Sequence, residues 1–127
     1  MSDSERRVAK ITAAHLGWED HGIFTCWLDL DYGGSGQGAG LYALDEYVVE
    51  KDRRVGTAEG MEFVMRLLKA CGVGRWEDLV GRTVYATATQ SKVLSIEPLP
   101  TEGGEKFVFE DVWESRVAAR TKAGGFA

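Results

Sequence analysis

Residues 23–31, IFTCWLDLD, decide the fold together with residues 33–40, GGSGQGAG, which follow them. In the first segment every second side chain is apolar, which predicts a strand with one face on a core. That face holds Phe24, Cys26, Leu28 and Leu30. The opposite face places the large ring of Trp27 beside the carboxylates of Asp29 and Asp31. This combination is unusual for a face that meets only water, so Trp27 is a candidate to stack on an amphipathic ligand.

Every second residue from Gly34 to Gly40 is glycine. If the segment is extended, one of its faces has no side chains, and a base, a ribose, a phosphate or a protein ring can approach the backbone closely. If it is a loop, successive amides can converge on an anion. A flexible or bulged hairpin connection is the alternative. The segment lacks the Gly-Lys-Ser/Thr ending of a phosphate-binding loop and the following helix of a dinucleotide fold. The candidate ligand contacts here are Gly34, Ser35, Gly36, Gln37 and Gly38.

The remaining pattern predicts an α+β fold, a twisted and mostly antiparallel sheet of five or six strands packed on one main helix. No repeated strand–helix–strand units occur, which argues against a doubly wound sheet. The expected strands are residues 8–16, 23–31, 41–47, 82–89, 93–97 and 106–113, with a charged loop at 50–54 and a short helical turn at 75–81.

The main helix is expected at Ala58–Cys71, with Thr57 as its N-cap and Gly72 as its left-handed stop. Its buried stripe is expected at Met61, Val64, Met65, Leu68 and Cys71, widened by Phe63 and Leu67.

Length and charge limit the function classes. The 127 residues, of which 44% are apolar, suit a single ligand-binding domain over 1–113 with a C-terminal tail at 114–127. A net charge of −5 argues against sequence-independent DNA binding. No run is apolar enough for a membrane helix, and the first residues lack the hydrophobic region of a signal peptide. We therefore expect a cytoplasmic protein with Cys26 and Cys71 as buried, reduced thiols.

The start of the main helix is a candidate phosphate site. Arg53 and Arg54 precede it, Thr57 caps it, and its first amides point outward at the positive end of the helix dipole. Arg66 could reach the same ligand from a second side. A solvated run of charges is the alternative.

The sequence Glu19-Asp20-His21 offers the only acid–base grouping that resembles catalysis. His21 with Asp20 or Glu19 could act in a nucleotide hydrolase, contact a ligand, or simply tie down a turn. No zinc-type spacing and no nucleophile elbow accompany it, so the sequence predicts no metal, no cofactor and no catalytic residue.

Three strings taken together resemble small phage and prophage proteins of the first Thoeris anti-defence family. They are residues 19–23 (EDHGI), residues 30–38 (LDYGGSGQG), and residues 54–62 (RVGTAEGME) with 76–81 (WEDLVG). The resemblance covers about His15 to Val84. It implies a small α+β domain that assembles as a homodimer or higher homo-oligomer with pockets near subunit interfaces.

The same resemblance implies a sponge rather than an enzyme. Such proteins bind cyclic nucleotide immune signals of bacterial hosts and sequester them without cleavage. These signals are glycocyclic ADP-ribose and, in some members, cyclic oligonucleotides of CBASS defence. A nucleotide hydrolase using His21, and an acidic phage inhibitor of a host defence protein, remain the alternatives.

Overall fold

The computed structural model describes residues 4–101 and 103–112. The predicted α+β fold is confirmed: one mostly antiparallel six-stranded sheet packs against the helix α1 (Ala58–Cys71). The sheet order is β3-β2-β1-β6-β7-β8. Its strands are β1 (Glu5–Trp18), β2 (Phe24–Asp31), β3 (Gly36–Ala43), β6 (Thr83–Ala88), β7 (Val93–Glu97) and β8 (Phe107–Val108). A separate two-stranded ribbon contains β4 (Asp45–Val48) and β5 (Arg53–Gly56).

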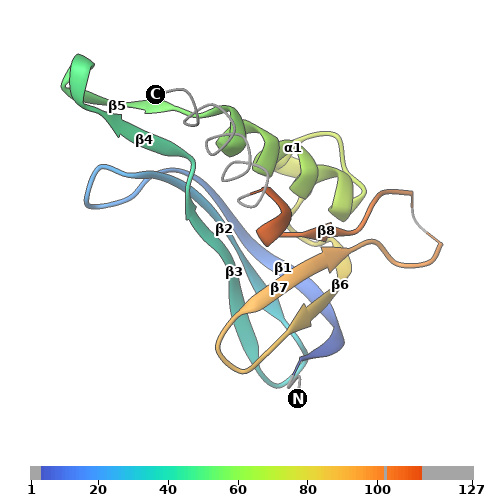
Figure 1. Cartoon of the computed structure of the whole chain (residues 1–127). Coiled ribbons are helices and arrows are strands. Elements are labelled where there is room, and N and C mark those ends of the chain that lie inside the picture. The colour runs from blue at the N-terminus through green and yellow to red at the C-terminus, as the bar shows by residue number, and fades with distance from the viewer. Residues whose placement is uncertain (1–3, 102, 113–127) are drawn as a thin grey trace.

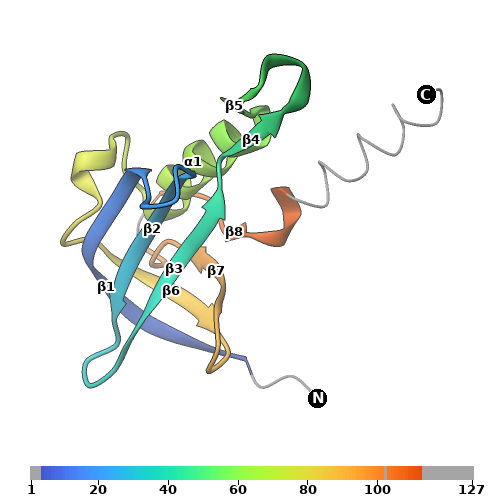
Figure 2. The same cartoon turned by 90° about the vertical axis from the view of Figure 1, so that its left-hand side faces the viewer.

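The long strand β1 holds the two halves of the sheet together. Its first part, Glu5 to Lys10, pairs with β6, and its second part, Lys10 to Trp18, pairs with β2. Register shifts in the β1–β2, β2–β3 and β6–β7 ladders increase the local twist. The sheet therefore curls, and the β2–β3 and β6–β7 hairpins reach the same end of the molecule, as Figures 1 and 2 show.

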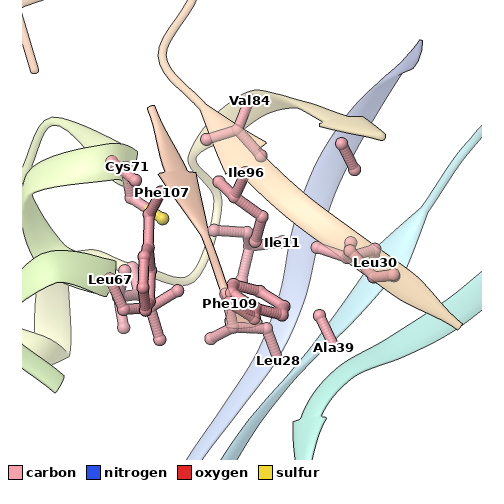
Figure 3. Packing of buried hydrophobic residues seen from close by; sticks show 14 of the residues in the cluster. Ile11, Leu28, Leu30, Ala39, Leu67, Cys71, Val84, Ile96, Phe107 and Phe109 are labelled. Carbon is pink, nitrogen blue, oxygen red and sulfur yellow. The ribbon is translucent and has the colours of Figure 1, made fainter. Parts of the chain in front are cut away.

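The concave side of this sheet carries the core, and α1 covers it (Figure 1). Three phenylalanine rings join the helix to the sheet: Phe63 lies 5.0 Å from Phe107 and 5.2 Å from Phe109, measured between ring centroids. The predicted core face of β2 is confirmed for Cys26, Leu28 and Leu30, which are buried, and Phe24 is partly buried against the same core. Figure 3 shows Leu28 and Leu30 in this core.

The helix bounds, the Thr57 N-cap and the Gly72 stop are confirmed, and so is the burial of Phe63, Leu67 and Cys71 in the predicted stripe. The predicted burial of the two methionines is wrong. Met61 and Met65 are 62% and 51% exposed. The buried face consists of Gly60, Phe63, Leu67, Ala70 and Cys71. Apolar spacing missed Gly60 and Ala70 because they are small residues that allow close approach rather than large apolar ones.

Two expected strands differ from the structure. The expected 41–47 strand is divided, because the glycine segment itself forms β3 and the chain leaves the sheet at Leu44 to form β4. The expected charged loop at 50–54 contributes Arg53 and Arg54 to β5, which pairs with β4. The expected 106–113 strand is reduced to β8, and residues 110–112 are helical.

The remaining predictions concern two strands and a short helix, the two cysteines, membrane helices and the C-terminal tail. Strands β6 and β7 and the short 3-10 helix at Trp76–Asp78 lie where they were expected. Cys26 and Cys71 are buried and unpaired, and burial raises the pKa of each thiol to about 12. No helix among the described residues is long and apolar enough to cross a membrane. The predicted tail at 114–127 lies outside the described residues.

Candidate functional site

A large hollow opens where the β2–β3 and β6–β7 hairpins meet, and we call it the mouth hollow. It has a volume of about 1300 Å³. It continues the concave side of the sheet beyond the core, because Arg7 alternates with the buried Ala9 and Ile11 along β1. Its lining residues are Glu5, Arg7, Tyr32, Ser35, Gly36, Gln37, Ala88, Thr89, Gln90, Ser91 and Lys92.

Two cations and one aromatic ring face this hollow. The Arg7 guanidinium carbon lies 5.2 Å from the centroid of the Tyr32 ring, and Arg7 also pairs with Glu5 at 2.5 Å. Lys92 is more than half exposed and lies 3.8 Å from Glu110. These ion pairs are open to solvent and therefore worth little, so an anionic ligand could compete for both cations.

The extended interpretation of the glycine segment is confirmed for Gly36, Gly38 and Gly40, which lie in β3. They pair with Asp31, Asp29 and Trp27 of β2 and leave the edge of the outer sheet face without side chains. Gly34 precedes the strand in the turn, where Tyr32 N–H donates to Ser35 O at 2.8 Å.

A second, smaller hollow of about 520 Å³ lies on the outer face, and we call it the outer hollow. The Trp27 ring stacks on His15 at 3.9 Å between centroids, with 19° between their planes. The Nε2 atom of His15 is buried, and it has no hydrogen-bond partner among the residues that the structure describes. His21 also lines this hollow, so the structure brings Trp27 and His21 together but separates them from Ser35, Gly36 and Gln37.

The Glu19–His21 pair lies in the turn between β1 and β2. The Glu19 carboxylate accepts a hydrogen bond from the His21 backbone amide at 2.6 Å and lies 3.4 Å from His21 Nδ1. Burial opposes ionisation of Glu19, but these hydrogen bonds outweigh it and lower its pKa. A carboxylate held in its charged form by a turn is a turn-stabilising group, and its lowered pKa disfavours a general acid at neutral pH.

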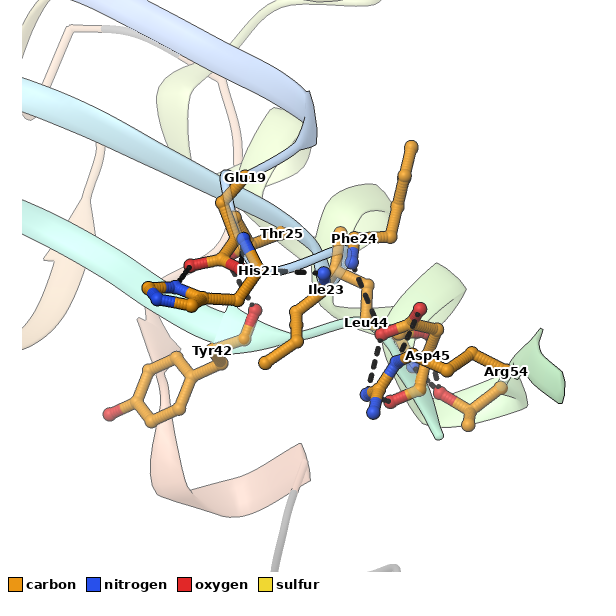
Figure 4. A network of polar contacts seen from close by, with 11 residues as sticks. Glu19, His21, Ile23, Phe24, Thr25, Tyr42, Leu44, Asp45 and Arg54 are labelled. Atoms are coloured by element: carbon orange, nitrogen blue, oxygen red, sulfur yellow. Dashed lines mark hydrogen bonds and ion pairs between the residues drawn. The ribbon is translucent and has the colours of Figure 1, made fainter. Parts of the chain in front are cut away.

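Arg54 and Thr57 have partners within the protein. The Arg54 guanidinium makes two 2.9 Å hydrogen bonds to the carboxylate of Asp45, whose side chain is only 3% exposed (Figure 4). The hydrogen bond from Arg54 is the main cause that lowers the pKa of Asp45. The Thr57 hydroxyl accepts from Gly60 N–H and donates to Leu44 O, both at 2.9 Å. Neither residue lines the mouth hollow or the outer hollow.

The other two predicted cations also lie elsewhere. Arg53 is exposed on β5 beside Arg54 and lines neither of these hollows. Arg66 stands over the Phe107 ring at 4.7 Å and lies 3.9 Å from Asp111. The glycine strand and the start of the helix therefore share neither of these two hollows.

The sequence interpretation missed Arg7, Tyr32 and Lys92. The alternation of Arg7 with Ala9 and Ile11 could have placed its side chain at the open end of the core face. Lys92 and Tyr32 belong to hairpins that meet only because the sheet curls, and no local pattern carries that information.

No group of three or more histidine, cysteine or acidic side chains with metal-binding geometry occurs in the part of the chain that the structure describes. Comparisons with protein-family models, with curated proteins and with solved structures each returned no match.

Proposed function

We propose that this protein binds a cyclic nucleotide immune signal and sequesters it without cleavage. The ligand class is glycocyclic ADP-ribose, with cyclic oligonucleotides as the wider class, and the place of action is the cytoplasm of a bacterial host. The mouth hollow carries the proposal. It combines Arg7 and Lys92 with the Tyr32 ring and with hydroxyl groups from Ser35, Thr89 and Ser91.

This combination matches the chemistry of such a ligand. A diphosphate attracts guanidinium and ammonium groups, and ribose hydroxyls pair with small polar side chains. The volume of about 1300 Å³ exceeds the roughly 300–1,000 Å³ of common small-molecule pockets, which suits a ligand larger than a mononucleotide.

Sequestration of a scarce signal requires a Kd near nanomolar, or about 12 kcal/mol of binding free energy. Such affinity for a small ligand demands nearly complete burial and a preorganised site. The mouth hollow opens to solvent in the single chain, so the proposal includes a homo-oligomer in which a second copy covers the bound ligand.

Binding without turnover is part of the proposal. The acid–base grouping that resembles catalysis, Glu19 with His21, lines the outer hollow rather than the mouth hollow. Retention of an intact signal needs no nucleophile beside the phosphates, and the ionisable residues lining the mouth are Glu5, Arg7, Tyr32 and Lys92.

Calorimetry with glycocyclic ADP-ribose tests the proposal. We expect saturable binding, followed by recovery of unchanged ligand when the protein is denatured by heat. A cyclic trinucleotide and ADP-ribose serve as comparison ligands. Chromatography that finds a degraded nucleotide would support the hydrolase instead. If none of the three nucleotides binds, the proposal is rejected.

A further inference from the structure

The two hairpins that frame the mouth hollow belong to strands that are distant in the sheet. Strands β2, β1 and β6 separate β3 from β7 in the sheet order. The hairpins approach only because the sheet curls, so no ladder of backbone hydrogen bonds fixes the distance between them. Something else must hold the hollow at a constant width.

The Gln37 side chain makes this connection. Its Nε2 donates to Thr89 O at 2.9 Å and to Gln90 O at 3.3 Å. These are the hydrogen bonds between the two hairpins within the described ranges. Both start from one amide group, so one substitution removes the whole polar connection.

Tyr32 fixes the orientation of that amide. Its hydroxyl donates to Gln37 Oε1 at 2.7 Å, which directs both Nε2 hydrogens at the opposite hairpin. Burial raises the pKa of Tyr32, with the Arg7 charge opposing it, so the hydroxyl keeps its proton at neutral pH. The amide thus has one donor group and one acceptor group, and both are engaged.

Close packing of β3 on β2 holds the backbone of Gln37 in place. Gly36 packs so closely on β2 that a Cβ there would lie 2.6 Å from Leu30 O. Gln37 pairs with Leu30 and points to the concave side, as the buried Ala39 does two residues later. The closely packed strand thus fixes the backbone from which the Gln37 side chain spans the mouth.

We propose that Gln37 is a positioning residue, a latch that holds the β2–β3 and β6–β7 hairpins at one separation and so preorganises the mouth hollow. Its effect on ligand residence rests on the proposed function, whereas its effect on the hairpins does not. A preorganised site saves the ordering cost of binding, and this saving normally slows dissociation rather than speeding association.

Hydrogen exchange on the free protein tests the latch first. In Gln37→Glu the side chain keeps its shape, but a carboxylate oxygen faces the carbonyls of Thr89 and Gln90 and is repelled. We expect the Thr89 and Lys92 amides to exchange about tenfold faster, which corresponds to losing one or two ordinary hydrogen bonds. The Leu28 and Val84 amides in the core strands should be unchanged.

Two further variants sharpen the exchange experiment. Gln90→Ala removes the other glutamine of the chain, whose side chain is exposed, and should leave both groups of amides unchanged. Tyr32→Phe keeps the Gln37 bridge but removes the group that orients it, so the same amides should exchange faster by a smaller factor. Unchanged exchange in Gln37→Glu, or equal acceleration in the core strands, would overturn the latch.

Binding kinetics then test its consequence. For glycocyclic ADP-ribose we expect about tenfold faster dissociation from Gln37→Glu than from the original protein, with association within about twofold. If the original protein binds no nucleotide, the proposed function fails and the exchange result still decides the latch. If hairpin exchange accelerates but dissociation does not, the positioning role is rejected while the proposed function stands.

Discussion

Two polar regions at opposite ends of the β3 strand differ in how their side chains are used. We call the cluster of Leu44, Asp45, Arg54, Thr57 and Gly60 the junction, where the ribbon, the sheet and α1 meet. Figure 4 shows Leu44, Asp45 and Arg54 of this cluster. At the junction the arginine and the threonine are satisfied by buried partners. At the mouth hollow, Arg7 and Lys92 remain exposed, with weak ion pairs that a ligand could replace.

The comparison shows that residue type alone does not distinguish a residue that binds a ligand from a residue that stabilises the fold. An Arg-Arg pair before a capped helix has the composition of a phosphate site, yet Arg54 of this pair pairs with the buried Asp45 at the junction, and Arg53 is exposed. What separates the two regions is burial: Asp45 is buried and needs a permanent counter-charge, whereas Glu5 is exposed and does not.

Gly60→Ala should produce the largest effect. A Cβ at this position would lie 2.2 Å from Leu44 O, closer than real side chains approach a backbone carbonyl. The helix must move away from the junction, and we expect the free energy of unfolding to fall by about 3 kcal/mol, the upper part of the range for overpacked cores. Urea denaturation monitored by circular dichroism measures it.

Gly56→Ala is the matched control, because a Cβ there has nothing within 4 Å. We expect a change within about 0.5 kcal/mol. Equal effects at the two glycines would show that the close packing of α1 on Leu44 does not stabilise the junction.

The next largest effect is expected from the two exposed cations of the mouth hollow, and it concerns ligand affinity rather than folding stability. Arg7→Gln combined with Lys92→Gln should weaken binding of glycocyclic ADP-ribose by about a hundredfold, since each charge-assisted contact contributes about 1.5–3 kcal/mol and part is recovered by water. Titration calorimetry measures the change, and the unfolding midpoint should move little because both side chains are exposed.

Arg53→Gln distinguishes the mouth hollow from the helix start that the sequence favoured. Arg53 is exposed, and it lines neither of the two hollows. We expect unchanged affinity. A loss of affinity in Arg53→Gln, with none in the double variant, would move the site back to the start of α1.

Acid should weaken the junction through Asp45. Its pKa is lower in the folded protein than the ordinary value near 3.9, so its contribution is complete above about pH 4 and is lost as the pH falls through the folded pKa. Asp45→Asn should lose about 1–2 kcal/mol of unfolding free energy at pH 7.

The difference between Asp45→Asn and the original protein should shrink as the pH falls below about 4, because the unfolded chain takes up a proton on Asp45 at a higher pH than the folded protein does. The exposed Asp29→Asn should behave like the original protein at pH 7. Urea denaturation at several pH values decides this, and a difference that stays constant from pH 7 to pH 3 would contradict the role of the Asp45 charge.

The sequence predicted local structure well where one periodicity dominates. The alternation in residues 23–31 fixed the core face of β2, and Thr57 and Gly72 fixed the ends of α1. The buried side of the helix was predicted only in part, because Gly60 packs closely on Leu44 through the absence of a side chain. Hydrophobic periodicity is read from apolar side chains, so it cannot indicate that a glycine is buried.

The site was harder to predict, for a physical reason. Ser35 and Gln37 meet Thr89 and Lys92 through the curvature of the whole sheet, and that curvature depends on register shifts in three ladders. Composition correctly marked the glycine strand as unusual. It could not indicate that the cations lining the same hollow would come from β1 and from the β6–β7 hairpin rather than from Arg53.

The smallest effect compares two glycines of β3. A Cβ on Gly36 would lie 2.6 Å from Leu30 O, whereas one on Gly38 would lie 4.0 Å from Leu28 O, an ordinary contact. Gly36→Ala should therefore lower the free energy of unfolding by about 1 kcal/mol. Gly38→Ala should leave it within about 0.5 kcal/mol, because relief of backbone entropy in the unfolded chain offsets any small crowding.

This pair also separates two uses of the glycine strand. If close packing of β3 on β2 explains its glycines, only Gly36→Ala is costly, and both variants keep their nucleotide affinity apart from any change in the latch beside Gly36. If instead a ligand lies flat on the side-chain-free outer face, Gly38→Ala weakens binding without changing stability. Affinity and urea midpoint measured on the same two proteins assign the glycines to packing at the mouth or to recognition on the outer face.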